Sequence, residues 1–233
     1  MALLFIEILI FLATLSASDI KGLEPVAGLH LEECIDCHGD KTDHEIMHEA
    51  VEIGCDVCHE STGEAHPEDG VMGFKLVDRT PDLCLSCHHI TQGKAILHSA
   101  IENGGCMICH QPHGSEFRVL LSDRYPAEDY LVASTDSFGL CFMCHDTDLL
   151  EAEKSEWATN FRHGDQNLHY IHMNGAKGRN CKFCHNLHGS DQTFLIEESV
   201  PFGNWEMQMN FIATEEGGSC LPGCHGKKVY SRQ

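Results

Sequence analysis

The chain has 233 residues and is strongly acidic, with 36 Asp and Glu against 15 Lys and Arg and a formal net charge of −21 at pH 7. This charge argues against binding to nucleic acid, which depends on clustered Lys and Arg, and against docking on anionic lipid. It favours either solubility alone or cationic partners, including metal ions.

The N-terminal segment predicts export. Residues 2–15 are almost entirely apolar, interrupted by Glu7, and residues 16–18 are small. This order is typical of a secretion signal, although no Lys or Arg precedes the apolar run. The run is shorter than the ~20 apolar residues that span a membrane. We expect residues 1–18 to be a signal peptide; a retained anchor is the alternative.

Every cysteine belongs to a short motif that ends in histidine. Six motifs have the form Cys-x-x-Cys-His, and the seventh has one more residue between its cysteines, so that seven pairs use all 14 cysteines. Cys-x-x-Cys-His is the attachment sequence of c-type haem, in which the thiols bond to the haem and the histidine becomes the proximal iron ligand. The sequence therefore predicts seven covalently bound haem c groups. The attaching cysteines are Cys34, Cys37, Cys55, Cys58, Cys84, Cys87, Cys106, Cys109, Cys141, Cys144, Cys181, Cys184, Cys220 and Cys224. The proximal ligands are His38, His59, His88, His110, His145, His185 and His225.

Three other interpretations of the cysteines explain the pattern less well. A structural zinc site groups Cys and His in fours, whereas here each cysteine pair has its own histidine and the pairs lie far apart. A disulfide framework does not place a histidine after every second cysteine. Thioredoxin-like motifs occur once or twice in a domain, not seven times.

The size of the chain limits the kind of core that it can form. Without the signal peptide, about 31 residues are left for each predicted haem, too few for an ordinary hydrophobic core. We therefore expect the haems to be the core. The predicted fold is mostly irregular, with short helices and few short strands, a multihaem cytochrome c fold wrapped around a chain of seven haems. Without haem we expect the chain not to fold.

The other histidines reveal an internal repeat. His48, His98 and His172 each precede a motif by seven to nine residues, and His113 and His188 each follow a motif within the sequence His-Gly-Ser. His66 is a looser equivalent in the first repeat. The chain is thus one leading motif followed by three two-motif units. The expected divisions are the signal peptide, an N-terminal arm with the first motif, unit 1, unit 2 with a connecting helix, and unit 3 with a C-terminal tail: 1–18, 19–43, 44–92, 93–168 and 169–233.

Few regular elements are expected between the motifs. Three short apolar stretches, 73–77, 116–121 and 193–196, predict half-buried strands. The composition of residues 146–158 predicts a helix that connects units 2 and 3. Segments 122–140 and 197–219 are long spacers marked by Pro and Gly.

Closure of each iron by a second histidine would require seven distal ligands. The repeat favours five of them: His48, His98, His113, His172 and His188. The other two come from six candidates: His30, His44, His66, His89, His163 and His169. His30 lies in the N-terminal arm and could reach the haem of a neighbouring copy. Because histidine is in surplus, we do not expect any of the eight Met residues to be a ligand.

The combination of a motif followed by His-Gly-Ser and a second motif downstream resembles the doubled-CxxCH multihaem c-type cytochromes, over roughly residues 30–225. That family includes extracellular electron-transfer proteins, and some relatives polymerise into filaments often called nanowires. The resemblance implies partners that are copies of the chain itself, redox partner cytochromes or extracellular metal acceptors. Two features depart from the family pattern: the longer motif at Cys220, and the absence of His-Gly-Ser after the first motif of unit 1.

The function expected from these features is electron transport rather than catalysis. Two histidines on an iron leave no position for substrate, so electrons would hop between closely packed haems. We expect an extracellular filament, with a monomeric periplasmic or extracellular shuttle as the alternative and no stable membrane insertion after signal removal. A multihaem oxidoreductase would need one open iron. A membrane quinol dehydrogenase would need an anchor with cationic flanks, and no Lys or Arg precedes Lys21.

Overall fold

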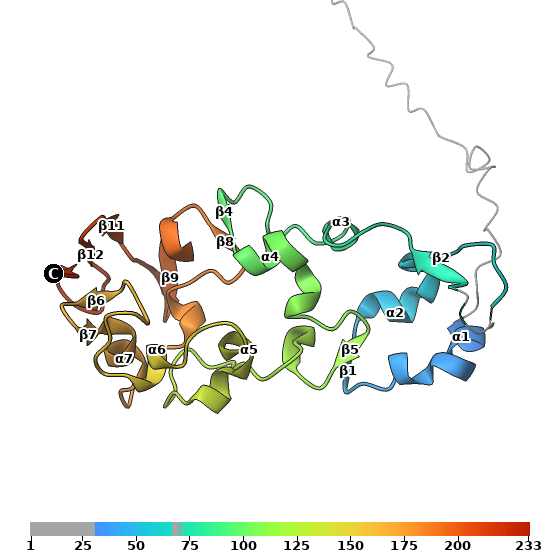
Figure 1. The fold of residues 1–233 in the computed structure, drawn as a ribbon, viewed down its shortest axis with the longest axis horizontal. Helices are drawn as coiled ribbons and strands as arrows, with labels where there is room; N and C mark the ends of the chain where they lie inside the picture. Colours follow the sequence, from blue (N-terminus) through green and yellow to red (C-terminus); the bar gives the residue numbers. More distant parts are fainter. Residues whose placement is uncertain (1–30, 67–69, 71) are drawn as a thin grey trace, which may run out of the picture.

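A computed structural model describes residues 31–66, 70 and 72–233, so the expected signal peptide and His30 lie outside the described residues. The molecule is elongated, and its elements follow the long axis approximately in sequence order (Figure 1). Helix α1 (Leu31–His38) lies at one end and strand β13 (Lys228–Ser231) at the other. Within the described ranges, no helix has the length and apolar character needed to cross a membrane.

The helices are short, and of those in the described residues three α-helices and three 3₁₀ turns overlap a cysteine motif. The further α-helices are α2 (Glu49–Ile53), α3 (Asp82–Leu85), α4 (Ser99–Gly104), α5 (Gly139–Phe142), α6 (Asp148–Glu151) and α7 (Leu168–Met173). The 3₁₀ turns are η1 (Gly39–Lys41), η2 (Cys55–Val57), η3 (Cys106–Ile108), η4 (Arg118–Leu120), η5 (Thr135–Phe138), η6 (Cys181–Phe183) and η7 (Thr193–Leu195).

The strands are also short and pair in antiparallel fashion. Two-stranded pairs join β1 (Ile46–Met47) to β5 (Gly114–Ser115), β2 (His59–Ser61) to β3 (Phe74–Leu76), β4 (Ile96–Leu97) to β8 (Gly189–Ser190), β6 (Arg162–His163) to β7 (Gln166–Asn167) and β9 (Ser199–Phe202) to β10 (Trp205–Gln208). At the C-terminal end, β11 (Ile212–Thr214), β12 (Gly217–Cys220) and β13 form a three-stranded sheet.

Two of these pairs interlock successive units. Strand β1 of unit 1 pairs with β5 of unit 2, and β4 of unit 2 pairs with β8 of unit 3. Each pair continues into a backbone bond between two histidines: His48 N–H donates to the His113 carbonyl at 2.9 Å, and His98 N–H donates to the His188 carbonyl at 3.0 Å. Successive units are therefore held together by hydrogen-bonded strands and not only by the segments of chain that connect them.

Apolar packing is confined to the C-terminal half. One cluster of buried side chains joins Phe183, Ile196, Val200, Met207 and Met209, and a second joins Phe138, Leu150 and Met173. The described residues between 31 and 120 contribute no buried hydrophobic side chain. The N-terminal half thus lacks an ordinary core, in agreement with the expectation from the length of the chain.

The predicted fold class is confirmed, but two of the three predicted strands are wrong. Residues 73–77 do contain β3. Residues 116–121 and 193–196 instead form the turns η4 and η7. Each turn holds two successive non-glycine residues at positive φ: Val119 (49°) and Leu120 (59°), and Phe194 (58°) and Leu195 (56°).

The connecting helix predicted at 146–158 is much shorter than expected. Only α6 forms, because the buried side chain of Asn167 donates to the carbonyls of Asp148, Leu149 and Ala152 and turns the chain away. Beyond the turn, the Ser155 hydroxyl accepts the backbone N–H groups of Trp157 and Ala158. Side-chain bonds thus replace helix bonds here, which composition does not predict.

Candidate haem sites

One helical turn gives most of the ordinary motifs their local geometry. The N–H of a motif histidine donates to the carbonyl of the first motif cysteine, at 2.9 Å in His88–Cys84 and at 3.0 Å in His110–Cys106. A turn of this kind places residues four apart on the same face, so that the first thiol and the imidazole lie on one side. In the longer motif, Cys220 ends strand β12 and the following loop packs on the β9–β10 hairpin.

Each motif histidine faces one other histidine across a gap of constant width. The ring centroids of the seven pairs are 6.0–6.5 Å apart: His38–His66, His48–His88, His59–His113, His98–His145, His110–His188, His169–His185 and His172–His225. Two imidazoles that bind opposite faces of one metal ion have centroids roughly 6 Å apart, since each metal–nitrogen bond is about 2 Å and each centroid lies about 1 Å behind its nitrogen. The gaps therefore fit one iron each.

The pairs account for most of the histidines that the sequence singles out. All five favoured candidates (His48, His98, His113, His172 and His188) face a motif histidine, and so do His66 and His169 from the wider set. His44, His89 and His163 have no such pairing in the part of the chain that the structure describes. His44 packs against Gly114, and His163 Nδ1 accepts the N–H of Ser231 at 3.1 Å.

The pairs follow two rules of connection. The second motif of each unit faces the histidine that precedes the first motif of the same unit, as in His88–His48, His145–His98 and His225–His172. The first motif faces a histidine from the following unit, as in His59–His113 and His110–His188, and the leading motif does likewise in His38–His66. The pair His185–His169 follows neither rule.

Comparison with known families agrees with this repeat. Residues 48–93 and 98–149 each match the family described as the doubled CXXCH motif. The two matched segments belong to the doubled-CXXCH family of multihaem c-type cytochromes. These two matches cover most of units 1 and 2, and the protein is accordingly an electron-transfer cytochrome with covalently bound c-type haem. Among curated proteins, no sequence matches this cytochrome.

The cysteines place neighbouring motifs of the cytochrome side by side. In three steps the first cysteines of two motifs interact: Cys34 with Cys55, Cys84 with Cys106, and Cys141 with Cys181. In the other three steps the second cysteine of a motif lies near the next motif: Cys58 near Cys87, Cys109 near Cys141 and Cys144, and Cys184 near Cys220 and Cys224. The attachment points therefore lie in single file, in sequence order.

The positive-φ turns direct backbone carbonyls to two proximal histidines. His110 Nδ1 lies 3.0 Å from the Val119 carbonyl, and His185 Nδ1 lies 2.8 Å from the Phe194 carbonyl. A donating Nδ1–H leaves Nε2 free for the metal and strengthens it as a ligand. Serine hydroxyls hold both turns, because Ser115 donates to the Leu121 carbonyl and Ser190 to the Ile196 carbonyl.

Other paired histidines also bond through Nδ1. His48, His172 and His225 lie 2.6–2.9 Å from the carbonyls of Pro112, Leu168 and Gly226. His98 differs, since its Nδ1 accepts the N–H of Ala100 at 3.3 Å.

Burial keeps several of these imidazoles neutral. Desolvation lowers the pKa of His98, His113, His172, His185 and His188, and it lowers the pKa of His169 to about 3. The neutral imidazole is the form that coordinates a metal. The cytochrome therefore presents these side chains in their binding form at neutral pH.

The His-Gly-Ser sequence is explained by close packing between units. A Cβ on Gly189 would lie 2.9 Å from the Ile96 carbonyl oxygen, and a Cβ on Gly114 would lie 2.7 Å from His44 Cβ. Only glycine fits where each strand meets the preceding unit. In each His-Gly-Ser sequence, the histidine faces a motif histidine, the glycine permits the close contact with the preceding unit, and the serine stabilises the following turn.

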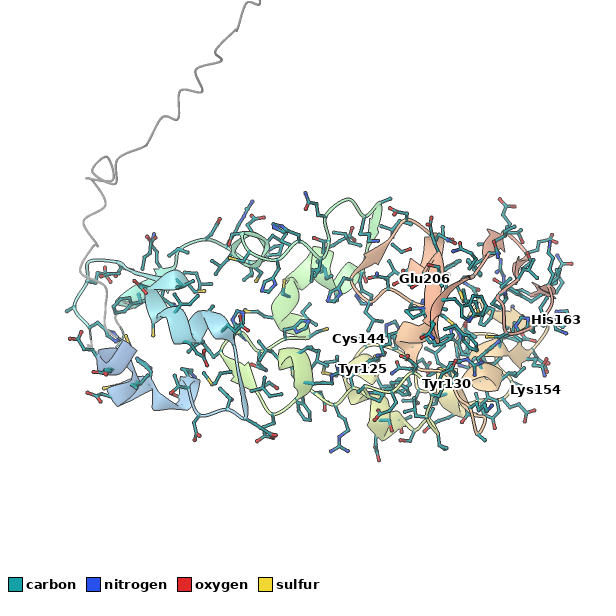
Figure 2. All side chains as sticks on the ribbon, turned by 180° about the vertical axis from the view of Figure 1, so that it is seen from behind. Tyr125, Tyr130, Cys144, Lys154, His163 and Glu206 are labelled. Carbon is teal, nitrogen blue, oxygen red and sulfur yellow. The ribbon has the colours of Figure 1, made fainter. Side chains whose placement is uncertain are left out.

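A second asparagine fixes the motif at Cys181. The buried Asn180 side chain accepts the Lys182 N–H and donates to the carbonyls of Pro126 and Glu128. Tyr125 adds a bond from its hydroxyl to Asn180 Oδ1. Burial raises the pKa of Tyr125. Tyr125 and Cys144 lie near the middle of the long axis, and Tyr130 lies further toward the C-terminal end (Figure 2). Spacer 122–140 thus holds this motif in place, a role that its composition alone does not indicate.

Proposed function

We propose that the cytochrome binds seven haem c groups, each closed by two of its own histidines, and carries electrons along them in sequence order. The observation that carries the proposal is the set of seven histidine pairs with centroids 6.0–6.5 Å apart, each containing one motif histidine. The single file of cysteines supports the order of transfer.

When bound, haem supplies the one-electron change at iron. The two histidines of each pair would both bind the iron and would leave no position for a substrate. The interlocked strands and the carbonyl bonds to Nδ1 keep the imidazoles in place during that change. This arrangement supports electron transfer rather than catalysis.

The test is to count and classify the haems in the matured protein. Intact mass should show seven haems on one chain, electron paramagnetic resonance should show only low-spin ferric iron, and the reduced protein should not bind carbon monoxide. Fewer than seven haems would contradict the count. A haem that binds carbon monoxide in the native protein would instead favour the oxidoreductase with one open site.

We further propose that the protein is exported and assembles head to tail as an extracellular filament. The charges at its two ends support this arrangement. Residues 31–66 contain eleven Asp and Glu and a single Lys, whereas the C-terminal sheet and tail, residues 212–233, contain Lys227, Lys228 and Arg232 against Glu215 and Glu216. A strongly acidic end and an end with a small excess of positive charge favour a repeated contact that does not close into a ring.

Electron cryomicroscopy of material sheared from the cell surface tests the assembly. We expect continuous filaments with haem density that is unbroken from copy to copy. Discrete particles would instead indicate the monomeric shuttle.

A further inference from the structure

The motif Cys181–His185 lacks the partner that the rule of the repeat would give it. As the first motif of unit 3, it should face the His-Gly-Ser histidine of a following unit, as His110 faces His188. Residues 191–233 contain no further His-Gly-Ser sequence. His185 nevertheless faces a histidine, His169, with centroids 6.3 Å apart and an interplanar angle of 18°.

The segment that presents His169 carries His172, the equivalent of His48 and His98, at its end, but the rest of it has no counterpart in units 1 and 2. It runs from residue 153 to 173 and consists of a loop, the small hairpin β6–β7 and helix α7. Asn167 caps α7 by accepting the N–H of His169 at 2.9 Å, while its amide donates to three carbonyls around α6. The position of His169 is therefore fixed by the end of unit 2.

The imidazole of His169 is itself oriented as a ligand. Its Nδ1 lies 3.1 Å from Thr159 Oγ1, which leaves Nε2 free to bind a metal. Phe161 packs edge-on against His169, with centroids 5.2 Å apart, and also packs against His172. One aromatic ring thus supports two histidines on successive turns of the same helix.

We propose that residues 153–173 form a cap over the motif Cys181–His185, in which His169 takes the place that a histidine of the next unit has at the other first motifs and closes the iron attached there. The proposal rests on the proposed function, namely that these motifs bind haem.

The surplus histidine nearest to the cap provides a matched control. His163 belongs to the same segment, is exposed, and bonds to the N–H of Ser231 rather than facing a motif. It lies at the C-terminal end of the molecule, well away from Cys144 (Figure 2). If another nearby histidine such as His163 could bind the iron attached at Cys181–His185, that iron would stay low-spin after the loss of His169.

The experiment compares His169→Ala with His163→Ala in the fully matured chain. In His169→Ala, we expect seven haems by mass, with one of the seven high-spin and able to bind carbon monoxide after reduction. Added imidazole should return that haem to the low-spin state. His163→Ala should match the native protein. An unchanged, fully low-spin His169→Ala protein would overturn the proposal.

Two further variants identify the opened haem and guard against failure to fold. Removing Cys181 and Cys184 from the His169→Ala chain should abolish carbon monoxide binding, and persistence of that binding would show that the open iron belongs to another motif.

If His169→Ala does not accumulate, His169→Met supplies another ligand and should raise the reduction potential of a single haem. Unchanged potentials would contradict the cap. A native protein that lacks seven low-spin haems would contradict the proposed function, whereas a native protein that has them beside an unchanged His169 variant would contradict the cap alone.

Discussion

At the scale of single residues, unusual backbone conformations coincide with the motif histidines. Two successive non-glycine residues at positive φ are costly, of the order of 1 kcal/mol or more each, and such conformations persist only where the surrounding structure imposes them. They occur at equivalent places in units 2 and 3, Val119–Leu120 and Phe194–Leu195, and each time they bring a carbonyl to a histidine Nδ1. The strain therefore accompanies the orientation of a ligand.

Asn167 provides the sharpest test at this scale. Its replacement by Ala removes the cap of α7 and leaves three carbonyls around α6 without their donor, so we expect a loss of about 2–4 kcal/mol in the free energy of unfolding. Chemical denaturation of the matured protein measures the change. The haems served by His169 and His172 should lose low-spin character first.

A matched control for Asn167 is Ser134, which caps η5 from an exposed position. Ser134→Ala should cost about 1 kcal/mol or less and leave the haem spectrum unchanged. Equal losses in both variants would show that Asn167 is no more than an ordinary cap.

At the scale of elements, the two-residue strands matter more than their length suggests. An isolated pair of such strands is not stable alone. Here each pair joins two units, and the bond that continues it links two histidines that face different motifs, as His98 and His188 do. The strand contact therefore couples two haem sites.

Gly189→Ala should break this coupling in unit 3. The new Cβ would meet the Ile96 carbonyl oxygen and Leu97 Cδ2 at 2.9 Å, so that β8 must move away from β4 and take His188 with it. We expect a loss of about 1–3 kcal/mol in stability and the opening of the haem that His110 serves. Thermal unfolding and carbon monoxide binding measure the two effects.

Gly175 is the control for this substitution, because a Cβ there meets only the Lys177 backbone nitrogen, at 3.9 Å. Gly175→Ala should behave as the native protein. If Gly189→Ala leaves His188 in place and binds no carbon monoxide, the coupling between β8 and the ligand is not rigid.

At the scale of the whole molecule, the distribution of charge bears on assembly. If the acidic end of one copy meets the basic end of the next, Lys227→Glu combined with Lys228→Glu should shorten or abolish the filaments, and added salt should weaken native ones. Filament length in electron micrographs measures this. Exchange of Lys94 and Arg118 for Glu is the control, since it makes the same change in net charge in the middle of the chain, away from residues 212–233. Equal effects of both exchanges would indicate a general response to net charge.

The sequence by itself determined the attachment points and the motif histidines, because a Cys-x-x-Cys-His motif is complete within five residues and one helical turn. It also predicted a fold with little regular structure, since so short a chain per haem cannot build an ordinary core. The sequence did not predict that residues 116–121 and 193–196 form turns rather than strands, because those turns depend on carbonyl bonds to His110 and His185.

Only the tertiary structure decided which histidines face one another. His110 and His188 belong to different units, and the five favoured candidates could be chosen from the repeat without their partners being known. His66 and His169 could not be separated from His44, His89 and His163 by spacing alone. The physical reason is that a coordination site fixes the distance between two side chains in space and sets no fixed separation along the chain.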